Sequence, residues 1–173
     1  MAGARSKTTA PDVLQIEHDE LEAARAALEQ HLVGWTLRGD AGSHEALPGL
    51  RAAGPDFEPL HRNIVAAIGE ATDARVDTSA ASIAMRLRSD SLLSEMGGKD
   101  YLISLAQGAP AIGSQSAASG RAFIESKIRA HREVITRRAV IEKDRELAQA
   151  INDRSPDVAV IAAERVSLAT MLA

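Results

Sequence analysis

The sequence contains no cysteine, few aromatic residues and no long hydrophobic run. Without cysteine, the chain cannot form disulfide bonds, use a thiol nucleophile or bind zinc through thiolates. No apolar run approaches the roughly 20 residues that span a bilayer. The first ten residues also lack the apolar core of a secretion signal. We therefore expect a cytoplasmic protein that does not enter a membrane.

Most of the apolar residues are small or aliphatic. Hydrophobic residues make up 45% of the 173 positions but aromatic residues only 2%. Alanine and leucine, which supply much of this content, are the strongest helix formers. No alternation of period two is long enough to predict a strand. The length suits one domain, or a small domain with an appended helical element, and the predicted fold is all-α.

The first part of the chain is predicted to be a disordered segment over 1–10 followed by a helical head over 11–108. Leu14, Leu21, Leu28 and Trp35 recur every seven residues, which predicts a first helix that ends before the glycines at 39 and 42. Shorter helices are expected near 43–52, 57–68, 79–96 and 101–105. Asp56 is expected to cap the helix near 57–68, and Ser79 or Thr78 the helix near 79–96. Gly97-Gly98 is expected to end the latter helix.

The second part is predicted to be a linker over 109–120 followed by a helical hairpin over 121–173. Its two helices meet at a turn near 152–154, and Ser155 with Pro156 would begin the second helix. A hairpin of this kind cannot bury both of its faces alone. It would pair with a second copy or another protein, or fold back onto the head. The residues predicted for self-association are Phe123, Ile124, Ile128, Ile135, Ile161 and Leu168.

Charge is distributed unevenly along the chain, whose net charge is −4. Residues 121–145 contain eight Lys or Arg and four Asp or Glu, so the rest of the chain is acidic. One interpretation is a basic surface that contacts a partner through Arg132, Arg137 and Arg138. The other is a solvated helix face with intrahelical charge pairs.

The search for catalytic and cofactor sites gives no candidate. Gly98-Lys99 is followed by Asp100, and Leu93 stands where a P-loop requires its first glycine. None of the five histidines has the spacing of a zinc-binding helix. His61 is expected to be a packed, hydrogen-bonded residue. We therefore predict no catalytic, cofactor-binding or metal-binding residue in this chain.

Several segments resemble the N-terminal domain of DnaB-family replicative helicases. The most specific is the pattern LLxEMGGxxYLxxL at residues 92–105, which is close to a signature of that family. The other similar segments, in the same order as in the family, are 29–40, 56–64, 76–87, 109–118 and 162–166. The chain departs from the family pattern at Glu58, where an aromatic residue is usual, in its longer stretch at 109–120, and in a first helix that begins earlier. These departures suggest a divergent phage-type or plasmid-type member.

The resemblance implies a helical head and a hairpin that form a homodimer, with three dimers assembled into the collar of a ring helicase. Such a collar recruits DnaG-type primase, or a helicase loader. ATP and magnesium would bind only in a motor domain beyond Ala173, and DNA would be bound only through the complete ring. The alternatives are a stand-alone replication adaptor or loader without a motor, and a helical DNA-binding regulator.

Overall fold

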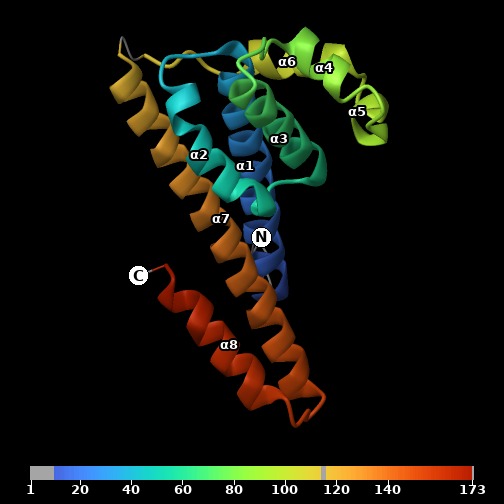
Figure 1. Ribbon diagram of the computed structural model, residues 1–173. Helices are drawn as coiled ribbons and strands as arrows, with labels where there is room; N and C mark the ends of the chain where they lie inside the picture. Colours follow the sequence, from blue (N-terminus) through green and yellow to red (C-terminus); the bar gives the residue numbers. More distant parts are fainter. Residues whose placement is uncertain (1–9, 114–115, 173) are drawn as a thin grey trace, which may run out of the picture. The chain divides into compact units, whose positions relative to one another are not determined.

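The computed structural model describes residues 10–113 and 116–172, and all regular structure among them is helical (Figure 1). The predicted all-α fold is therefore confirmed. The predicted disorder over 1–10 lies outside the described residues, except for Ala10, which begins the first helix. The α-helices are α1 (Ala10–Arg38), α2 (Ser43–Ala53), α3 (Pro59–Asp73), α4 (Ala80–Arg86), α5 (Ser91–Glu95), α6 (Lys99–Gly108), α7 (Ala117–Asn152) and α8 (Val158–Thr170), with a 3-10 turn η1 (Gly54–Asp56) after α2.

Local capping signals fix several of these boundaries as expected. The Ser79 side chain accepts a hydrogen bond from the backbone N–H of Ser82 and so caps α4. The single helix predicted near 79–96 is wrong, because α4 ends at Arg86 and the side chain of Asp90 caps a separate helix, α5, through Leu93 N–H. Gly97 and Gly98 both have positive φ angles between α5 and α6, a conformation that glycine adopts at little cost. Ser79 and the two glycines therefore act as the sequence predicts.

Other predicted boundaries are wrong. Asp56 does not cap α3, because it lies in η1 and Glu58 occupies the N-cap position with Pro59 following. Ser155 does not cap α8, because its hydroxyl accepts from Asp157 N–H and the helix begins at Val158. The helix α7 begins at Ala117, so the last four residues of the predicted linker are helical.

The described residues form two compact units, whose boundaries differ from those of the predicted head and hairpin. Residues 26–132 form what we call the head unit, and residues 10–25 with 133–172 form the hairpin unit. Both α1 and α7 contribute to each unit, because neither helix ends at the boundary. No helix of the described residues is both long and apolar enough to cross a membrane.

The head unit has a continuous hydrophobic core. Its Trp35 is 1% exposed and its ring lies 5.3 Å from that of Phe123 on α7, centroid to centroid. The indole N–H donates to the carbonyl oxygen of Pro110 over 2.6 Å, which holds the stretch after α6 against α1. Other fully buried members of this core are Leu32, Leu50, Ile64, Ile68, Ile83, Leu102 and Ile124.

Two glycines allow backbone to pack directly on backbone in the head unit. Gly42 has a φ of 83°, and a Cβ at this position would overlap the backbone of Ala117 and Arg121 in the first turns of α7. A Cβ at Gly120 would overlap the carbonyl oxygen of Ala41. The start of α7 is thus held against the turn between α1 and α2 at a separation that only glycine permits.

Candidate protein interaction site

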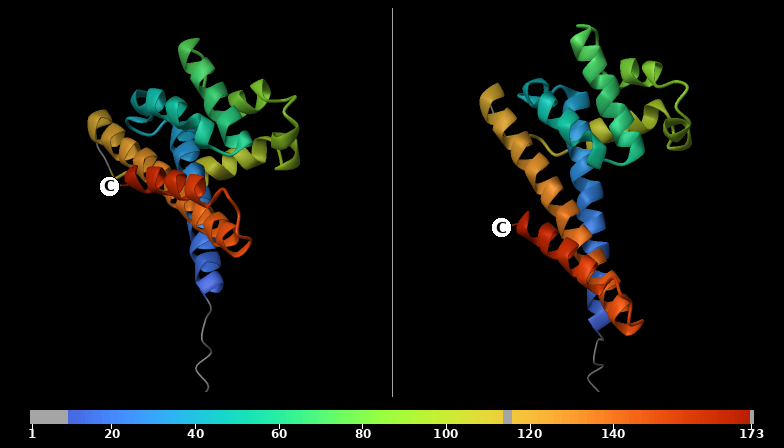
Figure 2. Two further views of the ribbon diagram at one scale, coloured as in Figure 1. Left: turned by 90° about the horizontal axis from the view of Figure 1, so that it is seen from below. Right: turned by 60° about the horizontal axis from the view of Figure 1, so that its bottom comes forward.

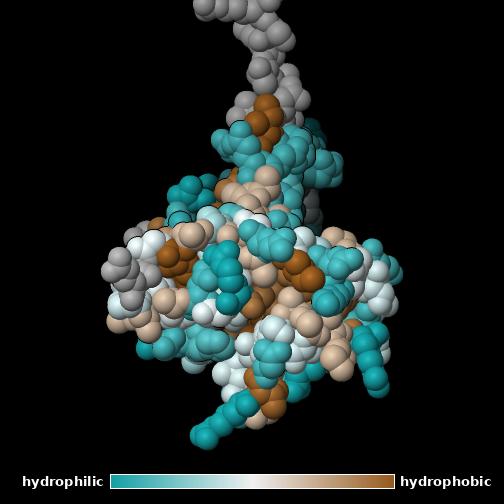
Figure 3. Space-filling view, turned by 90° about the horizontal axis from the view of Figure 1, so that it is seen from above, coloured by the Kyte–Doolittle hydropathy of each residue, from teal (hydrophilic) through white to brown (hydrophobic). Residues whose placement is uncertain are grey.

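The helix α8 is apolar along its whole length but contains no buried residue. Its only charged residues are Glu164 and Arg165. The side chains of Val160 and Val166 are 59% and 61% exposed. An apolar helix that its own unit leaves partly uncovered is typical of a protein–protein contact. Figure 3 shows another face of the molecule, on which hydrophobic residues lie as separate spots among hydrophilic ones.

Both charged residues of α8 are turned toward α7. Arg165 Nε lies 2.9 Å from Asp144 Oδ1, and Glu164 Oε2 lies 2.9 Å from Lys143 Nζ. The hydrogen bonds that the Lys143 ammonium donates to Glu146 and Glu164 raise its pKa to about 12. These ion pairs join the antiparallel helices α7 and α8, which Figures 1 and 2 show on either side of the turn that connects them. The outward side of α8 therefore carries no charge.

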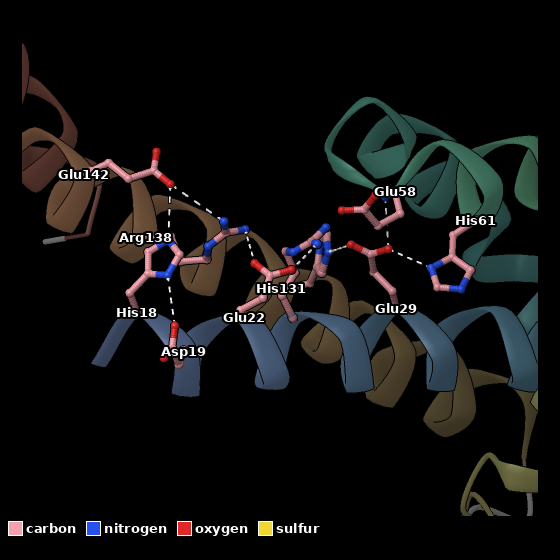
Figure 4. A network of polar contacts seen from close by, with 10 residues as sticks. His18, Asp19, Glu22, Glu29, Glu58, His61, His131, Arg138 and Glu142 are labelled. Atoms are coloured by element: carbon pink, nitrogen blue, oxygen red, sulfur yellow. Dashed lines mark hydrogen bonds and ion pairs between the residues drawn. The ribbon is translucent and has the colours of Figure 1, made fainter. Parts of the chain in front are cut away.

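A second set of ion pairs joins α7 to the first turns of α1 within the hairpin unit (Figure 4). Arg138 lies between two carboxylates, with Nη1 2.6 Å from Glu22 Oε2 and Nη2 3.7 Å from Glu142 Oε1. His18 Nε2 lies 3.4 Å from the same oxygen of Glu142. The hydrogen bond from Arg25 lowers the pKa of the Glu22 carboxyl, and the charge of Arg138 adds to this effect. The hairpin unit is thus a three-helix assembly rather than a bare hairpin.

The residues predicted for self-association lie in different environments. Ile124 and Ile128 are buried in the core of the head unit, where Ile128 lies against Gly49 of α2. They are therefore not available to a second copy of the chain. Phe123 is partly exposed and packs on Trp35. The other three predicted residues, Ile135, Ile161 and Leu168, lie in the hairpin unit and are half-buried.

The residues predicted for partner contact are all on α7. Arg137 is exposed, and its Nη2 lies 2.6 Å from Glu133 Oε1, one turn earlier. Arg138 is engaged with Glu22 and Glu142, as described above, and Arg132 is exposed in the head unit. Further intrahelical pairs join Arg121 to Glu125 and Lys143 to Glu146. These pairs agree with the interpretation of the basic segment as a helix face with charge pairs.

The head unit contains a buried carboxylate that sequence reasoning missed. Glu29 on α1 is 0% exposed, and its Oε2 lies 2.8 Å from His61 Nδ1 on α3 (Figure 4). The same oxygen accepts a hydrogen bond from the backbone N–H of Glu58 over 3.0 Å. Its Oε1 lies 3.0 Å from His131 Nε2 on α7. His61 Nε2 also lies 2.8 Å from the Tyr101 hydroxyl on α6, so this one cluster joins four helices.

The structure therefore bears out the expectation of a packed, hydrogen-bonded His61. Burial of Tyr101 raises the pKa of its hydroxyl, and the nearby charge of Glu29 adds to this effect. Within the described part of the chain, no three His, Asp or Glu side chains are placed to bind a metal ion. Glu29, His61 and His131 are too far apart in sequence for any spacing rule to have connected them. Their contacts join α1, α3, α6 and α7 within the head unit.

Comparison with known proteins agrees with this architecture. Residues 24–118 match the family described as the DnaB-like helicase N terminal domain. The fold is similar to the crystal structure of the N-terminal domain of DnaB helicase from Mycobacterium tuberculosis, with a TM-score of 0.52 and 22% sequence identity. That similarity covers 83% of this chain and 94% of the other. Among curated proteins, none matches the sequence.

Proposed function

Because this chain belongs to the family of DnaB-like helicase N-terminal domains, we propose that it is a non-catalytic assembly and partner-docking domain of a replicative DNA helicase. The observation that supports this role best is α8, which is apolar and has no buried residue. Association of two copies through the hairpin unit would cover the exposed valines of this helix. Such pairs would be the building blocks of the collar of a helicase ring.

Replacing Val160 and Val166 together by aspartate is expected to prevent self-association. Both side chains are largely exposed in the single chain, so the change leaves the core of the chain intact. In a dimer interface, each charge would be removed from water without a partner, which costs about 2 kcal/mol or more, roughly a thirtyfold loss of affinity. Sedimentation velocity over a range of concentrations measures the change, with circular dichroism to confirm the helical content.

Met85→Asp is the matched control, because Met85 is 76% exposed on α4 in the head unit. It should self-associate like the unchanged chain. A wild-type chain that stays monomeric at high concentration contradicts the assembly role. If the double variant and the wild type self-associate to the same sedimentation mass, the assignment of the self-association surface to α8 is contradicted.

We extend the proposal to recruitment of a DnaG-type primase through the basic residues of α7. Arg137 is the best position for a test, because it is exposed and pairs only within its own helix. An exposed pair of this kind contributes only about 0.3–0.5 kcal/mol to stability. Arg137→Glu should therefore leave the fold intact while weakening primase binding about tenfold, as measured by isothermal titration calorimetry. Lys99→Glu, an exposed change on α6, is the control, and unchanged affinity in Arg137→Glu would remove this residue from the contact.

A further inference from the structure

We propose that a groove in the hairpin unit, between α1 and α7, is a docking site for an amphipathic helix of another protein that has basic residues beside its apolar face. We call it the α1–α7 groove. It has a volume of about 630 Å³ and an apolar floor formed by Leu21, Ala24, Val140, Ile141 and Leu172. The inference goes beyond the proposed helicase role, because it depends only on the geometry and charge of this unit.

The residue spacing shows that the groove has the form of a helix-packing surface. The lining residues of α1 are at positions 17, 20, 21 and 24, and those of α7 are at positions 137, 140, 141 and 144. Each set follows the i, i+3, i+4, i+7 pattern, which places its members along one face of a helix. Two such faces side by side offer a groove into which the apolar ridge of a further helix can pack. The groove therefore fits a helix better than it fits a compact small molecule.

The charges at the edges of the groove indicate which charged residues a docking helix should carry. On the α7 side, Arg137 is paired with Glu133 and Asp144 with Arg165. On the α1 side, Glu17 and Glu20 are exposed, and no ion pair to either is found among the described residues. The groove thus carries two unneutralised carboxylates on one edge. A helix with lysine or arginine beside its apolar face would place its charges against them.

Among the described helices, α8 does not offer that combination to a second copy. The apolar helix with free surface is α8, whose only basic residue, Arg165, is already paired with Asp144. Its exposed side contains Val160 and Val166 and no cation. Glu17, Glu20 and Leu21 also precede residue 24, where the match to the helicase domain family begins.

Two synthetic helical peptides of equal length test the proposal with the full chain. Both carry leucines at i, i+3, i+4 and i+7; one has lysines beside the leucine face and the other has glutamates. We expect the lysine peptide to shift the methyl NMR signals of Leu21, Val140, Ile141 and Leu172. Its affinity, measured by fluorescence anisotropy, should be at least tenfold higher than that of the glutamate peptide at low salt and should fall as salt is added. Equal affinity for the two peptides, or methyl shifts confined to the head unit, would overturn the proposal.

Variants of the groove sharpen the test. Glu17→Lys with Glu20→Lys should reverse the preference of the chain in favour of the glutamate peptide, and Val140→Asp should abolish binding of both. Glu70→Lys with Glu95→Lys, two exposed changes in the head unit, is the matched control and should bind like the wild type. Equal loss in this control would overturn the proposal. A changed sedimentation mass in Glu17→Lys with Glu20→Lys would also overturn it, since the groove would then be a contact between copies. The valines of α8 are untouched by these variants, so this test and that of self-association can fail separately.

Discussion

Replacing Glu29 by alanine is expected to lower the free energy of unfolding by about 3 kcal/mol, because several buried donors lose their acceptor at once. The carboxylate is fully buried and receives hydrogen bonds at both oxygens. Without it, the ring nitrogens of His61 and His131 and the backbone N–H of Glu58 would lose their acceptor in a buried site. A buried donor left unpaired costs about 1–3 kcal/mol. Urea denaturation followed by circular dichroism measures the change.

Two comparisons make this result specific to the buried carboxylate. Glu95→Ala removes an exposed carboxylate from α5 and should change stability by less than about 0.5 kcal/mol. Glu29→Gln should lower the free energy of unfolding by more than Glu95→Ala but by less than Glu29→Ala. Its amide oxygen can still accept from His61 and Glu58, while its NH2 group faces His131. His131 Nδ1 has no hydrogen-bond partner in the described part of the chain, so the ring cannot change its tautomer without burying an unpaired N–H. A loss below about 1 kcal/mol in Glu29→Ala would show that the cluster adds little to stability.

Replacing Gly120 by alanine is expected to destabilise the head unit by about 3 kcal/mol, the upper part of the range for overpacked sites. In an open helix this change would stabilise, because alanine is a better helix former by about 0.5–1 kcal/mol. Here the added Cβ would overlap the carbonyl oxygen of Ala41, a backbone atom that no side-chain rotation can move away. The steric cost of the added Cβ therefore exceeds the gain in helix propensity, so the variant is less stable than the wild type rather than more stable. Thermal and urea unfolding of the variant measure it.

Gly108→Ala provides the control for this argument. Gly108 is also helical, at the end of α6, and nothing lies within 4 Å of a Cβ built there. This variant should be neutral or more stable by up to about 1 kcal/mol. If both glycine variants gain stability, the start of α7 is not held against the turn after α1 as closely as the structure describes.

The sequence predicted the fold where local signals decide it. The heptad spacing of the first helix, the polar cap at Ser79 and the glycines after α5 all correspond to observed boundaries or contacts. The start of α7 was missed because its first residues, Ala-Ala-Ser-Gly, have the composition of a linker. They are helical because Gly42 and Gly120 let them pack against the turn after α1. The residues of that turn lie about 80 positions away in the sequence, so no local pattern predicts the contact.

The candidate site was predicted less completely, for a different reason. Helical periodicity shows which residues share a face but not what covers that face. Ile124 and Ile128 therefore looked suitable for self-association although the head unit buries them. The cluster around Glu29 joins positions separated by 32 and 102 residues, and no local pattern links them. The hairpin was correctly expected to expose apolar surface, whereas the pairing of α7 with the first turns of α1 follows only from the three-dimensional arrangement.

Trp35 is the single tryptophan of the chain, and it is buried in the head unit against Phe123. Intrinsic tryptophan fluorescence therefore reports the state of one unit only, while far-ultraviolet circular dichroism records the helices of both. Denaturation curves that coincide for the two signals would mean that both units unfold as one cooperative body. A dichroism transition that begins before the fluorescence changes would mean that the helices around α8 melt first. The chain thus carries its own spectroscopic label for separating the stabilities of its two parts.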